Sequence, residues 1–177
     1  MDWGNVLLRG SIRVAWLAYA AALLWQIAAV SGWLNRLDVA RRSVVWWRLW
    51  ATGCAALAVH TWAAFAFVHH WSHASAVQET ARQTGQMLGW EFGNGIWFSY
   101  ALVVVWTLDV IWSARHPLGP QLVPTGLQAV VHGYIFFIVL NGVVTFQHGW
   151  YRWTGAGLLV MMVWGAWQGL RHRRSVV

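Results

Sequence analysis

The sequence predicts an all-α, polytopic transmembrane helical bundle that forms a single domain over residues 1–177. Apolar stretches cover residues 12–34, 44–71, 94–113, 127–146 and 155–170. A helix rises about 1.5 Å per residue, so about 20 apolar residues cross a hydrocarbon core of about 30 Å. Charged residues make up only 10% of the chain, against about 25% in an ordinary soluble domain. We therefore expect about five membrane-spanning helices.

The links between these spans are short, and tryptophans mark the span ends. The second span follows an arginine-bearing link, and residues 115–125 hold all three prolines, which exclude a regular helix there. Many of the 17 tryptophans fall at predicted span ends, where indole prefers the headgroup boundary. Trp46 and Trp50 are expected in this belt. Trp106 lies deeper, where it could flank a cofactor, although packing between helices is the favoured expectation.

Residues 72–93 form the longest link and are predicted to contain an amphipathic helix. Ala74, Val77, Ala81 and Leu88 recur at helical spacing and would form its apolar face. We expect this helix on the outer face, either lying in the membrane interface or covering the end of the bundle.

Arginine placement orients the bundle by the positive-inside rule. An outer N-terminus and a cytoplasmic C-terminus put eight arginines inside and four outside. The inner set is Arg36, Arg41, Arg42, Arg48, Arg115, Arg171, Arg173 and Arg174; the outer set is Arg9, Arg13, Arg82 and Arg152. The expected location is a bacterial cytoplasmic (inner) membrane.

The net charge of +7 comes from 12 basic residues, all arginine. Because they sit at span ends, we expect them to bind anionic headgroups of the lipid bilayer and expect no nucleic-acid partner. Gly165 and Gly169 form a GxxxG pair that permits close helix approach. This pair favours a partner membrane subunit or a homo-oligomer.

Three histidines, His69, His70 and His73, lie at and just beyond the end of the second predicted span. On a continuous helix they would project within one arc, and the i,i+4 pair His69 and His73 has the spacing that gives two imidazoles to one metal. This pattern predicts a cofactor site on the outer, non-cytoplasmic face. Histidines at a headgroup boundary can also be amphipathic anchors without a ligand.

Further ligands are available on the same face. His148 ends the fourth span, and Glu79 and Glu91 lie in the outer link. Imidazole with carboxylate suits a transition metal such as Cu, Zn or Fe. A bis-histidine heme b, with one axial ligand from the cluster and the other from His148, is equally permitted.

A second group of ionisable residues lies inside the predicted spans. Arg48, Asp109 and His132 are each about five residues from the inner membrane face, so they can meet if their helices are neighbours. A buried carboxylate must be paired or protonated, and Arg48 is the expected partner of Asp109 because it is permanently charged. A structural ion pair and a proton-relay or quinone-site group are both open.

His60 lies near the middle of the membrane and points away from His69. Asn141 has a comparable depth and could bond to it. His60 could alternatively ligate a heme by itself, although a buried histidine is more often simply hydrogen-bonded.

These features favour a metal- or heme-binding redox-type membrane subunit. Five spans with histidines at helix ends resemble, in architecture only, the heme-carrying membrane subunits of respiratory oxidoreductases, and no residue role is carried over. The alternatives are a small transporter or channel that uses Asp109, His132 and Arg48, and a non-catalytic scaffold or assembly subunit. No nucleophile triad, phosphate-binding loop or dinucleotide fingerprint is present, so whether the chain is an enzyme stays open.

Overall fold

The computed structural model describes residues 3–116, 126–141, 157 and 160, and all regular secondary structure in these residues is helical. The elements, in chain order, are α1 (Trp3–Val30), α2 (Val39–Ala63), the π-helical turn η1 (Ala64–Val68), α3 (His73–Leu88), the 3-10 turn η2 (Gly93–Gly95), α4 (Ile96–Arg115) and α6 (Gly126–Leu140).

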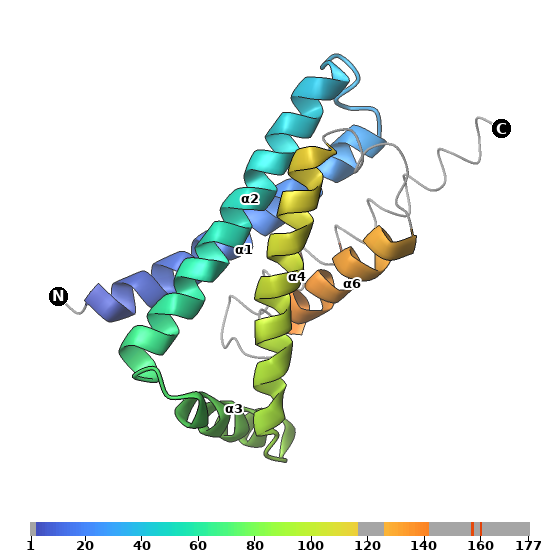
Figure 1. Cartoon of the computed structure of the whole chain (residues 1–177). Coiled ribbons are helices and arrows are strands. Elements are labelled where there is room, and N and C mark those ends of the chain that lie inside the picture. The colour runs from blue at the N-terminus through green and yellow to red at the C-terminus, as the bar shows by residue number, and fades with distance from the viewer. Residues whose placement is uncertain (1–2, 117–125, 142–156, 158–159, 161–177) are drawn as a thin grey trace.

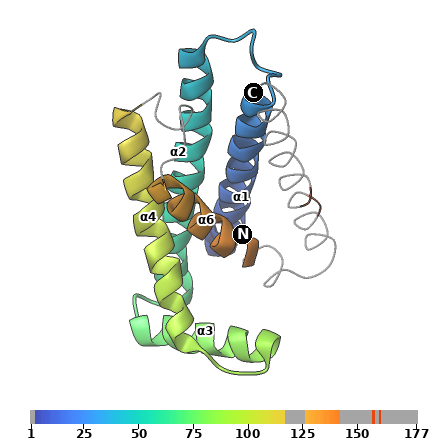
Figure 2. The ribbon, with the colours of Figure 1, turned by 90° about the vertical axis from the view of Figure 1, so that its right-hand side faces the viewer.

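The long helices pack in sequence order, and α3 lies across one end of them (Figure 1). α1 and α2 form an antiparallel hairpin, α4 packs against α2, and α6 packs against α4. Figure 2 shows the same arrangement from the side, with α3 nearly perpendicular to α4. The α1–α2 link and the end of α4 lie at the opposite end of the bundle from α3.

Three helical segments are long and apolar enough to cross a membrane: Trp3–Ala29, Val39–Val68 and Gly93–Arg115. They correspond to the first three predicted spans, although the first two begin earlier than predicted. The described part of the fourth predicted span is the 15-residue helix α6. The fifth predicted span, apart from two residues, lies outside the described part of the chain, as do the proline-bearing link and the pair Gly165 and Gly169.

The second predicted span is wrong at its C-terminal end, because the helix does not continue to residue 71. α2 passes into η1, which ends at Val68, and the chain then turns. His70 and Trp71 have φ of 48° and 62°, in the left-handed region that is unfavourable for residues with a Cβ. Ser72 then caps α3 by accepting a hydrogen bond from the Ser75 amide at 3.2 Å.

The amphipathic helix is confirmed as α3, but its packed face differs from the predicted one. Ala76 and Thr84 are buried, whereas the predicted apolar residues Ala74 and Leu88 are exposed. α3 packs on the segment around η2, where a Cβ on Gly93 would lie 2.7 Å from Val77 Cγ1. The close approach of the two segments therefore depends on glycine at position 93.

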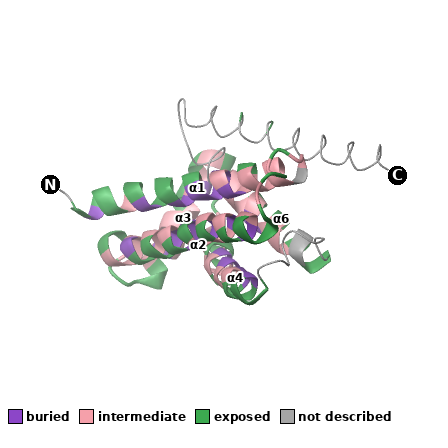
Figure 3. Cartoon of the chain, turned by 90° about the horizontal axis from the view of Figure 1, so that it is seen from above, coloured by how far each residue is buried: buried purple, intermediate pink, exposed green. Residues whose placement is uncertain are grey.

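The core lies between α1, α2, α4 and α6, and its largest fully buried side chains are Trp50, Trp106 and Ile135. Figure 3 shows buried residues along the facing sides of the long helices and exposed residues along their outer sides. The exposed sides are themselves apolar, including Leu17 of α1 and Leu108 of α4, which is compatible with contact with lipid.

Candidate functional site

The candidate site is a group of aromatic and ionisable side chains in the core, where the four long helices meet. α1 provides one residue, α2 two, α4 two and α6 one. We call this group the aromatic–Asp site; its members are Tyr19, Trp46, Trp50, Trp106, Asp109 and His132.

Helical spacing brings these side chains to a common face. Trp46 and Trp50 are four residues apart on α2, and Trp106 and Asp109 are three apart on α4, so each pair lies on one side of its helix. Gly53 makes room for Trp106: a Cβ at position 53 would lie 2.9 Å from Trp106 Cζ2. The missing side chain therefore lets α2 and α4 approach closely around an indole ring.

Asp109 is buried, and its carboxylate accepts a hydrogen bond from Trp50 Nε1 at 2.7 Å. The expected pairing with Arg48 is wrong, because Arg48 is exposed. Two residues along a helix correspond to a rotation of about 200°, so Arg48 points away when Trp50 points inward. Within the part of the chain that the structure describes, the hydrogen-bond partner of the buried carboxylate is therefore a neutral donor.

His132 lies beside this pair. Its ring centroid is 5.0 Å from that of Trp50 and 6.2 Å from that of Trp46, and it lies within the electrostatic influence of Asp109. The structure thus brings Asp109 and His132 to one place, with the Trp50 indole in contact with both. Asp109 lies six residues before the end of α4, and His132 lies six residues after the start of α6. Each is therefore about 9 Å along the helix axis from that end.

Two more indoles of the site have buried donors. Nε1 of Trp46 and Nε1 of Trp106 are both inaccessible, and neither has a hydrogen-bond partner among the residues that the structure describes. Trp46 stacks on Trp50 with ring centroids 5.4 Å apart, and Trp106 contacts Trp50 at 5.0 Å and Tyr19 at 5.7 Å. Buried donors of this kind call for an explanation, because leaving one unpaired is costly.

The two residues that the sequence places near the middle of the membrane, His60 and Asn141, lie elsewhere. His60 Nδ1 is 3.0 Å from the backbone oxygen of Leu8 in α1, and Asn141 Nδ2 donates to the Phe137 oxygen of its own helix at 2.7 Å. The expected bond between His60 and Asn141 is therefore replaced by a backbone contact for each. A carbonyl is only an acceptor, so this contact places a proton on Nδ1, and in the neutral imidazole Nε2 is then the nitrogen with a free lone pair.

The three histidines of the predicted outer site do not share one helical arc, because the turn at His70 and Trp71 separates them. His69 ends η1, His70 is exposed in the turn, and His73 begins α3. His73 Nδ1 is 3.0 Å from Tyr100 Oη of α4, whereas His69 Nδ1 is buried with no partner within the described segments. His69 and His73 are therefore not i,i+4 neighbours on one helix, and their sequence spacing no longer predicts that they bind the same metal ion.

Two carboxylates are predicted from the sequence as further ligands for this site. Glu79 lies close enough to His69 for their charges to interact, but its oxygens already have partners. Both oxygens of Glu79 bind Arg82, and one of them also accepts from Gln83, while the Glu91 side chain lies over Gly85. Among residues 3–116 and 126–141, no three metal-binding side chains lie close enough together to hold an ion. His148 lies outside the described residues.

The aromatic part of the site was missed because Trp46 and Trp50 were assigned to the interface belt. Trp50 is instead 1% exposed and Trp46 4% exposed. The available signal was their i,i+4 spacing on the face of α2 that also carries Gly53 and Cys54, which a lipid-facing pair would not need.

No protein-family model, curated protein or solved structure matches this chain. The chemistry of this protein must therefore be inferred from the aromatic–Asp site and the histidines described above.

Proposed function

We propose that the chain is an integral membrane protein in which Asp109 and His132 bind and release a proton inside the bilayer, as the relay group of a small transporter or of a redox-type subunit. One observation carries the proposal. A buried carboxylate is held by the neutral indole of Trp50, beside an imidazole, while the exposed Arg48 is directed elsewhere.

The identity of the partner decides between a fixed ion pair and a group that can titrate. An arginine keeps its proton at all relevant pH values and would hold Asp109 in the charged form. An indole N–H orients the carboxylate but supplies no balancing charge. Ionisable residues that face the interior of a bundle are typical of proton pathways in membrane proteins.

His132 supplies the second proton-binding group. Its ring is only half-buried and lies against Trp50 and Trp46, and histidine changes charge near neutral pH. The site therefore holds two proton-binding groups, a buried acid and a less buried imidazole, and both contact the Trp50 indole.

Proton uptake by liposomes that contain the purified protein tests this proposal. An internal pH-sensitive dye reports the rate after a pH step, and infrared difference spectra report the protonated carboxyl band. We expect Asp109→Asn to abolish the band and to slow uptake, and His132→Gln to slow uptake. Asp38→Asn, which alters the exposed N-cap of α2, is the matched control. Unchanged uptake and an unchanged band in Asp109→Asn would contradict the proposal.

The second candidate, a heme- or metal-binding redox subunit, is favoured by the geometry of His60. Histidine ligands of metals commonly donate their other ring N–H to a backbone carbonyl, as His60 does to Leu8. The Nε2 atom is then the one that could bind a heme b iron, or a Cu, Zn or Fe ion. Hemin titration should shift the Soret band of the wild type but not of His60→Leu, with His70→Leu as the control. Identical spectra for wild type and His60→Leu would argue against it.

A further inference from the structure

We propose that the outward face of α2 holds a site for the phosphate of an anionic phospholipid, formed by Arg41 and Arg48 with Val44 between them. The site is independent of the proposed function, because a helix turns by about 100° per residue and both arginines therefore point away from Trp50 and the aromatic–Asp site. The sequence predicts only a general attraction of arginines to headgroups, whereas the structure distinguishes this pair.

The first observation is that both arginines are exposed and lack an ion pair. Neither Arg41 nor Arg48 pairs with any carboxylate in the part of the chain that the structure describes. The nearest acid in the sequence, Asp38, caps α2 by accepting from the Ala40 amide. The predicted partner of Arg48, Asp109, binds an indole in the core instead. An unpaired arginine on a surface that faces lipid is costly, so this pair calls for an anion from outside the bundle.

The second observation is the spacing of the pair. Seven residues make almost two helical turns, so Arg41 and Arg48 point within about 20° of each other and lie about 10 Å apart along the axis. Val44 lies between them and is 44% exposed, so the surface there is open. Long arginine side chains can run along a helix surface toward a polar layer, and both guanidinium groups can therefore meet over Val44. Their planar donor groups match the oxygens of a phosphate.

The third observation places the pair at the level of the lipid headgroups. Trp47 Nε1 of α2 donates to the backbone oxygen of Val110 in α4 at 3.2 Å, and the two helices run in opposite directions (Figure 1). Trp112 therefore lies near the level of Val45, between the two arginines. Its side chain is 57% exposed, and an exposed indole prefers the boundary between hydrocarbon and headgroups. The arginine pair is then within reach of lipid phosphates.

The fourth observation is an apolar surface that continues from the arginines along α2. In steps of seven residues from Arg48, Ala55 and Trp62 occupy the same face, and both are exposed. An acyl chain attached to the bound phosphate can lie along this surface, which favours a lipid over a free phosphate ion. Because the pair carries two positive charges, a headgroup with a net negative charge is favoured over a zwitterionic one.

The test compares two lipids with identical acyl chains, phosphatidylglycerol and phosphatidylcholine. Each is used as a spin-labelled probe in bilayers that contain the full chain, and electron spin resonance separates lipid held at the protein surface from bulk lipid. High salt screens diffuse attraction, whereas direct contacts persist. We expect the wild type to prefer phosphatidylglycerol under these conditions.

Variants test the two arginines separately. Arg41→Gln and Arg48→Gln should each reduce the preference for phosphatidylglycerol about five-fold, the effect of one basic residue near an anionic surface. Arg36→Gln is the matched control, because Arg36 is exposed in the link between α1 and α2 and its loss changes the net charge equally. This control should leave the preference in high salt unchanged. Circular dichroism should show the same helix content in all three variants.

Three results would overturn the proposal. Equal binding of the two lipids by the wild type would show that the site does not exist. A loss in Arg36→Gln as large as in Arg48→Gln would show only diffuse attraction. If Arg48→Gln leaves the lipid preference unchanged but abolishes an oligomer detected by chemical cross-linking in the bilayer, the anion is a carboxylate of another protein chain.

Discussion

The indole of Trp50 donates a hydrogen bond to the carboxylate of Asp109 at 2.7 Å, and this contact joins α2 to α4 inside the bundle. Both residues are buried. Because the acceptor can be charged and water is excluded, the contact should contribute more than a neutral surface hydrogen bond.

Trp50→Phe tests this contact, because phenylalanine keeps an aromatic ring and removes the donor. We expect a loss of about 1.5–3 kcal/mol in the free energy of unfolding, the range for a hydrogen bond to a charged group. The measurement is unfolding in detergent micelles, followed by circular dichroism. Trp112→Phe removes an exposed indole from α4 and should have little effect.

A double-mutant cycle separates the hydrogen bond from the change in packing. In an Asp109→Leu background, Trp50→Phe should cost clearly less than in the wild type, because the acceptor is already gone. Equal costs in both backgrounds would show that Trp50 acts through packing alone.

Gly53→Ala is expected to destabilise the protein although alanine favours a helix. The added Cβ would lie 2.9 Å from Cζ2 and 3.1 Å from Cη2 of Trp106, whose side chain is fully buried. Overpacking of this kind costs about 1–3 kcal/mol, more than the gain of up to about 1 kcal/mol in helix propensity. The shift in the detergent unfolding transition measures the balance.

Gly10→Ala in α1 is the matched control, since a Cβ there meets no atom within 4 Å; it should be neutral or stabilising. Phenylalanine lacks the outer ring atoms of Trp106, so Gly53→Ala should be tolerated better in a Trp106→Phe background. Destabilisation of the same size in that background would contradict the steric explanation.

Much of this fold follows from the lengths of the apolar stretches in the sequence, which correctly predict the three long helices. The same reasoning placed Asp109 and His132 at one depth, and the structure brings them together. The prediction of the partner of Asp109 was wrong for two reasons. Tryptophans near the end of a span usually lie in the membrane interface, and a permanently charged residue is the usual partner of a buried carboxylate. The rotation of α2 that buries Trp50 and exposes Arg48 depends on tertiary packing around Gly53.

The break at residues 69–72 was missed for a different reason. The sequence there contains neither glycine nor proline, and the turn instead uses left-handed φ values at His70 and Trp71. The local signal was Ser72, a residue type preferred at the N-cap of a helix. The prediction that His69, His70 and His73 share one face of a helix is wrong because it assumes that a single helix continues through Ser72.

The ion pair between Glu79 and Arg82 on α3 predicts a pH dependence in acid. The hydrogen bond from Arg82, aided by Gln83 and the arginine charge, lowers the pKa of Glu79 from 4.5 to about 2. A carboxyl with a lowered pKa stabilises the folded state above its unfolded pKa, and this contribution is lost as pH falls from 4.5 to about 2.

Glu79→Gln should therefore match the wild type near pH 2 and be slightly less stable at pH 6, as measured by the midpoint of thermal unfolding at each pH. The difference should be small and should shrink in high salt, because the pair is exposed. Glu91→Gln, which removes a different carboxylate and leaves Arg82 paired, should not reproduce this profile. A difference that grows toward acid pH would contradict the assignment.

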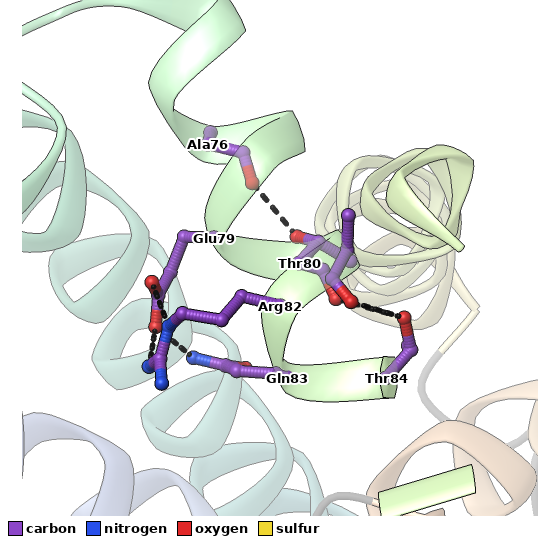
Figure 4. A network of polar contacts seen from close by, with 7 residues as sticks. Ala76, Glu79, Thr80, Arg82, Gln83 and Thr84 are labelled. Atoms are coloured by element: carbon purple, nitrogen blue, oxygen red, sulfur yellow. Dashed lines mark hydrogen bonds and ion pairs between the residues drawn. The ribbon is translucent and has the colours of Figure 1, made fainter. Parts of the chain in front are cut away.

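Two threonines on α3 differ in what their hydroxyls bind, and this difference gives a paired test. Both donate to carbonyl oxygens of their own helix (Figure 4), but Thr84 Oγ1 also accepts from the Phe92 amide at 2.7 Å. Thr84→Val leaves that amide without its acceptor and should cost about 1–3 kcal/mol, whereas Thr80→Val should cost little. Amide hydrogen exchange at Phe92 should accelerate in Thr84→Val and stay slow in Thr84→Ser. If Phe92 exchanges equally slowly in all three variants, the hydroxyl of Thr84 does not hold the segment around η2 against α3.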